Sequence, residues 1–287
     1  MTDPLESAAA GVSGTDLLVP RGDTLLVGEL SGDGRAVLLL HGLSATRRYV
    51  TMGSRALERA GHRVIAYDAR GHGDSAPAAD RTAYSYGELV ADAAALLDAT
   101  GTARAVLAGV SMGAHTALAL ALADPERVAG VVAITPGHDP ETFADPARLA
   151  HWDALARGLR EGGVDGFLAA YGTPPGLSER QRALVTTATR QRLARHRDLA
   201  AVADALSTVP RSAPFRSLAA LGAIAVPVVV VASRDELDPE HPHALAGAYA
   251  AAIPGASLVT EAPGKTPLAW QGGQISRVIA ELAARAG

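Results

Sequence analysis

Hydrophobic residues are grouped along the chain in short unbroken runs, separated by longer segments of mixed polarity. Four runs, at 35–40, 105–108, 128–134 and 226–232, are almost wholly aliphatic. Runs of this length and composition are typical of strands buried on both faces of a parallel sheet. In the first half of the chain they alternate with helix-like segments, which predicts an α/β fold with a parallel sheet.

Shorter patterns complete this predicted sheet. Asp16–Leu30 alternates apolar and polar residues around a turn at Pro20–Asp23, which predicts an antiparallel hairpin at the sheet edge. Val64–Tyr67 and Ala256–Thr260 read as two further short strands, which makes eight in all. The segments expected to be helical, and to flank the sheet, are 47–60, 85–100, 114–123, 243–252 and 275–286.

The pattern changes between residues 138 and 215. No strong strand occurs there, and helical segments are broken at Gly162-Gly163, at 174–176, at Pro210 and at Pro214. We therefore expect a helical cap at 138–215, inserted into a core formed by 15–137 and 216–287. Residues 1–14 are small and acidic and are expected to form a loose N-terminal tail.

Composition narrows the classes of function. The net charge of −4 provides no broad basic surface for nucleic acid, so a small-molecule substrate is the expected partner. No apolar run approaches the roughly 18 to 20 residues that span a bilayer. The absence of cysteine excludes disulfides and thiolate metal sites and agrees with a cytoplasmic location. The histidines show no metal-ligand spacing and no dinucleotide fingerprint is present, so no cofactor is expected.

The candidate chemistry centres on Gly109-Val110-Ser111-Met112-Gly113, which lies between a predicted strand and a predicted helix. A turn this sharp places its central residue at unfavourable backbone angles and brings the helix close to the strand, so glycine is needed on both sides. Ser111 would then be exposed at the turn. The backbone amide of Met112, at the start of the helix, would be free to bind an oxyanion.

Three motifs together resemble the α/β-hydrolase fold superfamily of serine-nucleophile type. They are His41-Gly42 after the third strand, Tyr67–Ser75 after the fourth, and Gly109–Gly113. The resemblance implies that Ser111 is the nucleophile and that the amides of Leu43 and Met112 form the oxyanion hole. It also implies scaffolding roles for a set of polar side chains, namely His41, Arg70, His72 and Asp74.

The same resemblance indicates where the acid of a catalytic triad should lie. In the superfamily it usually follows the seventh strand, four residues before a proline, and Asp235 stands four residues before Pro239. Asp238, directly before that proline, is interpreted as a turn or helix-cap residue. Asp139, after the sixth strand, occupies another position that some relatives use for the acid.

The expected histidine is missing from its usual place. Superfamily members carry it after the eighth strand, and the matching stretch here is Ala262–Pro267, with Lys265 where histidine belongs. No histidine follows His243. A lysine, with a pKa of about 10.4, is almost wholly protonated at neutral pH and is a poor base unless its pKa falls by about three units. Asp235 beside it would oppose that fall.

Three functions therefore remain open. In the first, a dry pocket lowers the pKa of Lys265 enough for Ser111 to hydrolyse an ester, thioester or lactone. In the second, protonated Lys265 assists a non-hydrolytic lyase or cyclase reaction together with Ser111 and the oxyanion hole. In the third, catalysis is lost and the fold binds a ligand, since fold alone never establishes an activity.

Other histidines could supply a base. His115 lies one helical turn beyond Ser111 and is expected to be structural. The remaining candidates fall into three groups with different expected places: His138 and His151 at the entrance of the cap and able to approach the site, His241 and His243 as surface or capping residues, and His62 and His196 as solvated residues.

The predicted cap contains the residues that could contact a substrate. Its aromatic side chains could line an apolar pocket of medium size or pack between helices, and they are Phe143, Trp152, Phe167 and Tyr171. Arg190, Arg192, Arg195 and Arg197 form a basic segment. We interpret it as a solvated helix face, with attraction of an anionic or carrier-bound substrate as the alternative.

Overall fold

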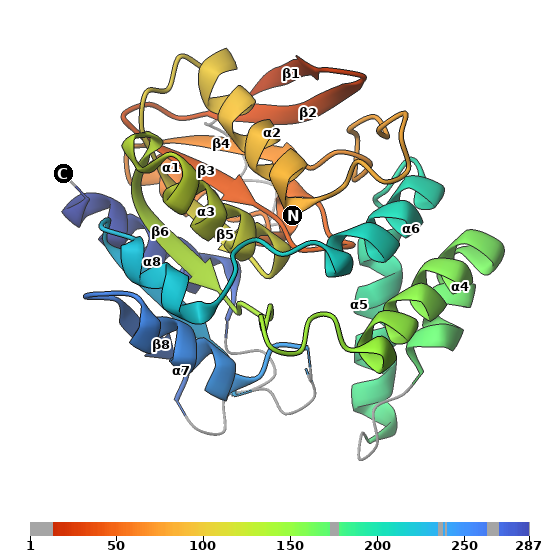
Figure 1. Cartoon of the computed structure of the whole chain (residues 1–287). Coiled ribbons are helices and arrows are strands. Elements are labelled where there is room, and N and C mark those ends of the chain that lie inside the picture. Colours follow the sequence, from red (N-terminus) through yellow and green to blue (C-terminus); the bar gives the residue numbers. More distant parts are fainter. Residues whose placement is uncertain (1–13, 173–177, 235–237, 239, 263–269, 287) are drawn as a thin grey trace, which may run out of the picture.

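Eight strands form a single sheet in a computed structural model that describes residues 14–172, 178–234, 238, 240–262 and 270–286 (Figure 1). Their order across the sheet is β1-β2-β4-β3-β5-β6-β7-β8. The strands are β1 (Thr15–Arg21), β2 (Thr24–Ser31), β3 (Arg35–Leu40), β4 (His62–Asp68), β5 (Ala105–Val110), β6 (Val128–Ile134), β7 (Val228–Ala232) and β8 (Ser257–Thr260).

The pairing follows from the hydrophobic patterns. Six neighbouring strands, β4-β3-β5-β6-β7-β8, pair in parallel. At the other side of the sheet, β2 pairs antiparallel with both β1 and β4. The β1–β2 hairpin turns at Gly22, whose φ of 60° suits glycine. The predicted α/β class, with a mostly parallel eight-stranded sheet, is therefore confirmed.

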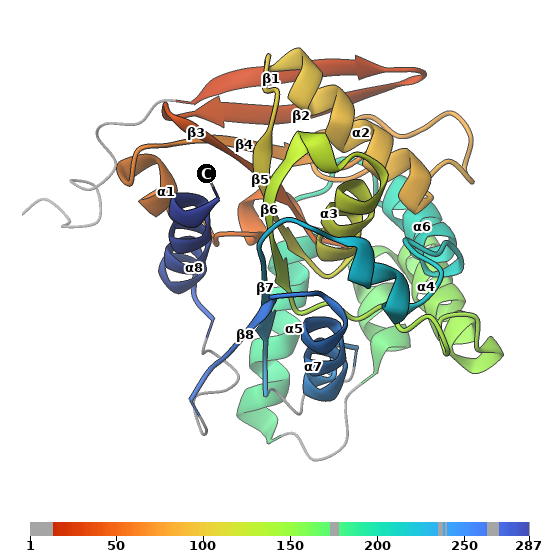
Figure 2. The same ribbon diagram turned by 60° about the vertical axis from the view of Figure 1, so that its left-hand side comes forward.

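Helices cover both faces of the sheet (Figure 2). Leu38 and Leu40 face one layer, made by α2, α3 and α7. Val37 and Leu39, which alternate with them, face the other layer, made by α1 and α8. The bounds are α1 (Ala56–Arg59), α2 (Tyr86–Ala99), α3 (Met112–Ala123), α7 (His243–Ala252) and α8 (Gly272–Arg285). None of the described helices has the length and apolar composition required to cross a bilayer.

One predicted helix is wrong. Residues 47–60 were expected to form a continuous helix, but they form a 3-10 turn, η1 (Arg47–Tyr49), and the four-residue α1. Between them Met52 and Gly53 have positive φ values of 49° and 75°. These angles are incompatible with a right-handed helix, so the segment breaks there.

Three α-helices lie between β6 and β7 in the chain and gather beyond the carboxyl ends of the central strands (Figure 1). We call them the cap helices: α4 (Pro146–Tyr171), α5 (Glu179–Leu193) and α6 (Leu199–Thr208). The expected break at Gly162-Gly163 is present, because Gly163 has a φ of 57° and divides α4 into two halves. The halves pack where Gly158 and Gly166 meet, since a Cβ on either would collide with the other's backbone.

The cap helices have a hydrophobic core of their own. It contains Leu155, Leu159, Phe167, Leu193, Val202 and Leu206, all nearly inaccessible to solvent. In the described part of 138–215 no residue is assigned to a strand. The predicted N-terminal tail, except Gly14, lies outside the described residues.

His196 connects the cap helices to the core, which corrects the expectation that it is solvated. Its ring is buried, Nδ1 accepts a hydrogen bond from the Gly73 amide at 2.9 Å, and Nε2 lies 3.1 Å from the Ser44 carbonyl oxygen. Next to it, Arg197 forms an ion pair with Asp74 at 2.8 Å. The loops after β3 and β4 are therefore joined to the segment between α5 and α6.

The buried ring of His196 predicts that the folded protein becomes less stable in acid. Burial lowers the pKa of His196 to about 4, whereas the ring in an unfolded chain binds its proton near pH 6.5. Between these values the unfolded state holds more protons, so the free energy of unfolding decreases as the pH falls from about 6.5 to 4, by up to about 3 kcal/mol. Urea denaturation at pH 7.5 and 4.5 measures this loss. His196→Gln should be less stable at pH 7.5 and lose less on acidification; an unchanged loss would contradict the assignment.

Candidate active site

Ser111 lies at a sharp turn between β5 and α3. Its backbone angles, φ 50° and ψ −112°, are strained for a residue with a side chain. A Cβ on Gly109 would overlap the backbone of Gly113, and a Cβ on Gly113 would overlap the backbone of Leu40. The two glycines thus allow helix and strand to approach closely enough to hold Ser111 in this conformation.

Backbone hydrogen bonds keep the turn in place. The Ser111 amide donates to the Ile134 carbonyl at 3.0 Å, and the His115 amide donates to the Ser111 carbonyl at 3.0 Å. Met112 is the first residue of α3, so its N–H has no acceptor within that helix. Its backbone is therefore available beside the serine.

The loop after β3 forms the opposite side of the site. Ser44 has a positive φ of 63°, and the Ala45 amide donates to the Gly42 carbonyl at 3.0 Å, so the chain turns tightly around Leu43. Leu43 and Met112 both line the cavity that contains Ser111. The two residues expected to supply the oxyanion hole therefore both lie in the cavity wall beside Ser111.

Buried polar side chains brace the loops around this site. Arg70 donates two hydrogen bonds to the carboxylate of Asp92, at 2.7 and 2.6 Å, and both side chains are almost fully buried. His41 accepts a hydrogen bond from the Ala69 amide at 2.8 Å and thereby links the loop after β3 to the loop after β4. These contacts agree with the scaffolding roles implied for His41 and Arg70.

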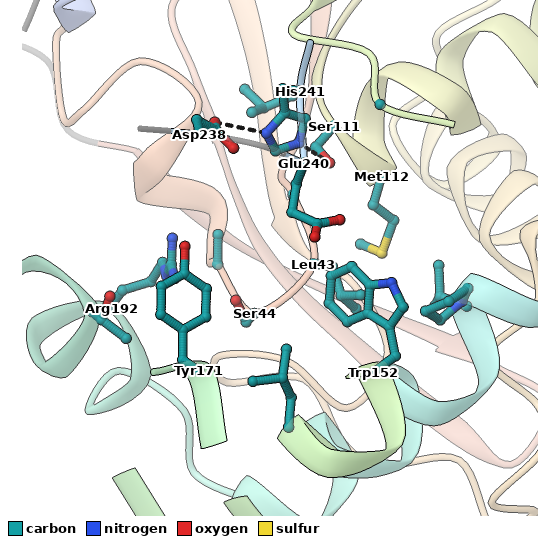
Figure 3. Close-up of a pocket in the computed structure, with 18 of the residues that line it drawn as sticks. Leu43, Ser44, Ser111, Met112, Trp152, Tyr171, Arg192, Asp238, Glu240 and His241 are labelled. Carbon is teal, nitrogen blue, oxygen red and sulfur yellow. Dashed lines mark hydrogen bonds and ion pairs between the residues drawn. The ribbon is translucent and has the colours of Figure 1, made fainter. Parts of the chain in front are cut away.

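A histidine ring contacts Ser111. The Nε2 atom of His241 lies 2.8 Å from the Ser111 hydroxyl oxygen, and its Nδ1 atom lies 2.8 Å from an oxygen of Asp238 (Figure 3). Because a carboxylate only accepts, the ring donates its Nδ1 hydrogen to Asp238. In the neutral ring the lone pair of Nε2 then points at the Ser111 hydroxyl and accepts its hydrogen bond.

Asp238 and His241 are held in one tight turn that precedes α7. The His241 amide donates to the Asp238 carbonyl at 3.3 Å. Burial alone would raise the pKa of Asp238, but the hydrogen bond and charge of His241, together with the Glu240 amide, bring that pKa below its usual value. The carboxylate is therefore ionised at neutral pH and can orient the imidazole ring.

These contacts correct two interpretations of the sequence. His241 was expected to be a surface or capping residue, but its side chain is only 20% exposed and bridges Ser111 and Asp238. Asp238 does close a turn, yet its carboxylate also binds the ring. One signal in the sequence could have revealed the pair: an aspartate and a histidine three residues apart in the loop after the seventh strand, in a chain with no histidine after His243.

Of the other candidate acids and the lysine, the structure describes only Asp139. Asp235 and Lys265 lie outside the described residues, so the proposed pair of Asp235 and Lys265 stays a prediction. Asp139 accepts hydrogen bonds from the Glu141 amide at 2.9 Å and the Thr142 hydroxyl at 3.0 Å. It therefore closes the turn in which it lies.

The remaining histidines near the site have other contacts. His115 is buried, and its Nδ1 atom lies 2.7 Å from the Tyr86 hydroxyl oxygen. Its Nε2 atom accepts hydrogen bonds from the backbone amides of Gly137 and His138, both at 2.9 Å. It thereby supports the chain after β6, as expected of a structural residue. His138 and His151 line the cavity. Burial lowers the pKa of His138 to about 4, so this ring is neutral at neutral pH.

A cavity of about 450 Å³ opens above Ser111 and is covered by the cap helices (Figure 3). Trp152, Phe167 and Tyr171 all line it, as does Phe143. Phe167 also packs into the hydrophobic core of the cap helices and stacks on Tyr171 at a centroid distance of 6.0 Å. The cap side of the cavity wall is thus mostly apolar, and it also includes the charged side chains of Arg148 and Arg192. Among the described residues, no cluster of three or more metal-ligating side chains is arranged to hold an ion.

Comparison with known proteins identifies the family of this chain. Residues 35–265 match the family model described as the alpha/beta hydrolase fold. Over 125 residues the chain is 42% identical to RutD of Variovorax paradoxus, named as a candidate carbamate hydrolase; the match covers 42% of this chain and 47% of RutD. The chain thus spans about half the length of that relative.

Two further matches extend over more of the chain. Over 214 residues it is 31% identical to the 2-hydroxy-6-oxononadienedioate/2-hydroxy-6-oxononatrienedioate hydrolase 2 of Pseudomonas putida, covering 72% of this chain and 73% of that protein. The crystal structure of a hydrolase from Pseudomonas aeruginosa PA01 superimposes with a TM-score of 0.69 at 25% identity, covering 97% and 98% of the two chains. The chain therefore belongs to the alpha/beta hydrolase fold family.

Proposed function

We propose that this protein is a serine hydrolase that cleaves a carboxylic ester, thioester or lactone. The observation that carries the proposal is the chain of contacts from Ser111 through His241 to Asp238, with both separations at 2.8 Å. A nucleophile bonded to a base, and a base oriented by an acid, is the arrangement that activates a serine hydroxyl.

The reaction proceeds through an acyl-enzyme. The Ser111 oxygen forms a bond to the substrate carbonyl carbon while the Nε2 atom of His241 takes the hydroxyl proton. The bond to the leaving alcohol or thiol then breaks, and His241 returns the proton to that group. Water repeats the sequence on the acyl-enzyme, releasing the acid and restoring the serine.

The other groups stabilise charge during these steps. Asp238 accepts the Nδ1 hydrogen bond and stabilises the imidazolium that forms when His241 takes the proton. The amides of Leu43 and Met112 donate to the oxygen of the tetrahedral intermediate. Trp152, Phe167 and Tyr171 contact the apolar part of the substrate from the cap side of the cavity.

The role inferred for His241 makes the hypotheses that depend on Lys265 less favoured. The hypothesis that Lys265 replaces the histidine, as a lowered-pKa base or as the acid of a lyase or cyclase, was needed because no base was assigned. A histidine in contact with Ser111 removes that need and favours hydrolysis. Two relatives of this chain are named as hydrolases, which supports a hydrolytic reaction.

A fluorophosphonate probe tests the proposal. Because the probe reacts with activated serines, we expect it to add to Ser111 in the wild-type protein at close to one label per chain. Peptide mass spectrometry identifies the modified residue, and Ser111→Ala is the matched control that should remain unlabelled. An unlabelled wild-type protein that is folded by circular dichroism would argue against an activated nucleophile.

A further inference from the structure

One cation in the wall of the cavity lacks an acidic partner among the residues that the structure describes. Arg192 lies in the last turn of α5 and lines the cavity, near Tyr171 (Figure 3). Its Nε atom is buried and has no hydrogen-bond partner, and it forms no ion pair with any described carboxylate. A guanidinium group stays protonated in proteins, so a buried donor of this kind is left unsatisfied.

Two other arginines of the basic segment form ion pairs away from the cavity. Arg190 pairs with Asp165 on the outside of the cap helices, and Arg197 pairs with Asp74 of the core. Arg190, Arg195 and Arg197 are exposed, as expected of a solvated face, and only Arg192 departs from that expectation. Arg192 differs from these three residues because its side chain reaches the cavity.

The other charges that line the cavity have partners. Asp238 is bonded to His241, and Glu240 lies 3.7 Å from Arg148. Burial lowers the pKa of Arg192, and the neighbouring Tyr171, Tyr49 and Asp238 offset only part of that effect. The charge of Asp238 acts on Arg192 through space, but no described carboxylate forms an ion pair with this guanidinium, and its buried Nε donor stays unsatisfied on the wall made by the cap helices.

We infer that Arg192 binds a carboxylate of the substrate, so that the preferred substrates are carbonyl compounds with a free acid group away from the bond that is cleaved. A planar guanidinium matches the two oxygens of a carboxylate, and the pairing would satisfy the buried Nε donor. Trp152 lines the same cavity, and its indole Nε1 is also buried without a partner. It provides a second donor for a polar substrate atom. The identity of the cleaved bond rests on the proposed function, whereas the carboxylate site does not.

The charge dependence of turnover tests this assignment. The substrates are the 4-nitrophenyl monoesters of adipic and suberic acid, and the same compounds with the free acid converted to its methyl ester. We expect wild-type kcat/KM to be higher for the free acids than for the methyl esters. Arg192→Met should lower this ratio by about 10- to 100-fold, the loss typical of a hydrogen-bonded charged pair.

Two variants separate recognition from structure. Arg190→Met removes a neighbouring charge on the same helix and should leave the ratio unchanged. Arg192→Lys keeps the charge without the planar fork and should retain part of the preference. A wild type with no preference for either free acid, or an Arg192→Met variant that loses activity equally on acids and methyl esters, would overturn the inference.

Binding without turnover distinguishes this inference from the proposed function. Isothermal titration calorimetry of the adipic and suberic monoesters with Ser111→Ala, and with Ser111→Ala/Arg192→Met, measures affinity in the absence of an acyl-enzyme. We expect the second variant to bind about 10- to 100-fold more weakly. Binding that depends on Arg192 but no turnover by wild type would reject the hydrolase and keep the carboxylate site. Equal affinity in both variants would reject the site alone.

Discussion

Replacing His241 with glutamine should lower kcat/KM for 4-nitrophenyl esters by about 10⁴-fold, because the Ser111 hydroxyl loses its general base. Glutamine is similar in size and still forms hydrogen bonds, so the fold should be kept. Steady-state kinetics measures the loss, and the melting temperature and circular dichroism verify the structure. Fluorophosphonate labelling of Ser111 should slow in parallel, since the probe needs the same activated oxygen.

Lys265→Met is the competing variant for this experiment. If His241 is the base, Lys265→Met retains most of the activity. If Lys265 is the base or the essential acid, the order is reversed: Lys265→Met is inactive and His241→Gln remains active. The two variants thus discriminate between the lysine hypothesis and the histidine contact seen at 2.8 Å.

Asp238→Asn should lower kcat by about 10³- to 10⁴-fold, the size of effect seen when the acid of a catalytic triad becomes an amide. The asparagine amide can donate to Nδ1 of His241, which favours the tautomer with its hydrogen on Nε2. That tautomer cannot accept the Ser111 proton. Steady-state kinetics at neutral pH measures the effect, with KM expected to change little.

Asp235→Asn is the matched control, because Asp235 is the acid that the family resemblance favours and lies three residues earlier. The proposed triad predicts near wild-type kcat for Asp235→Asn. A large loss with Asp235→Asn and a small one with Asp238→Asn would assign the acid to Asp235 and leave Asp238 as a turn residue.

The fold was predictable because its signals are local. A strand buried on both faces needs consecutive apolar residues, and β3, β5, β6 and β7 appear in the sequence as such runs. The turn that holds Ser111 was equally visible, because a side chain at Gly109 or Gly113 would collide with backbone, at Gly113 and at Leu40 respectively. The helix predicted at 47–60 failed because apolar spacing does not report the positive φ values at Met52 and Gly53.

The partners of Ser111 were less predictable. The ring of His241 contacts Ser111 across 130 residues of chain. The contact is possible because β7, which precedes His241, is separated from β5 by β6 alone. The family pattern predicts the catalytic histidine in the loop after β8, where the sequence has Lys265. The pattern specifies where a histidine usually comes from, whereas the geometry of the site only requires a ring nitrogen at hydrogen-bonding distance.

Amino-acid order alone was thus sufficient for the sheet, the strained turn and the position of the serine, since each depends on contacts between chain neighbours or on burial. The choice among nine histidines, and the separation of Arg192 from its neighbouring arginines, came from how distant loops and the cap helices pack around one cavity. Hydrogen bonds act over about 3 Å, and only the folded chain brings such residues within that distance.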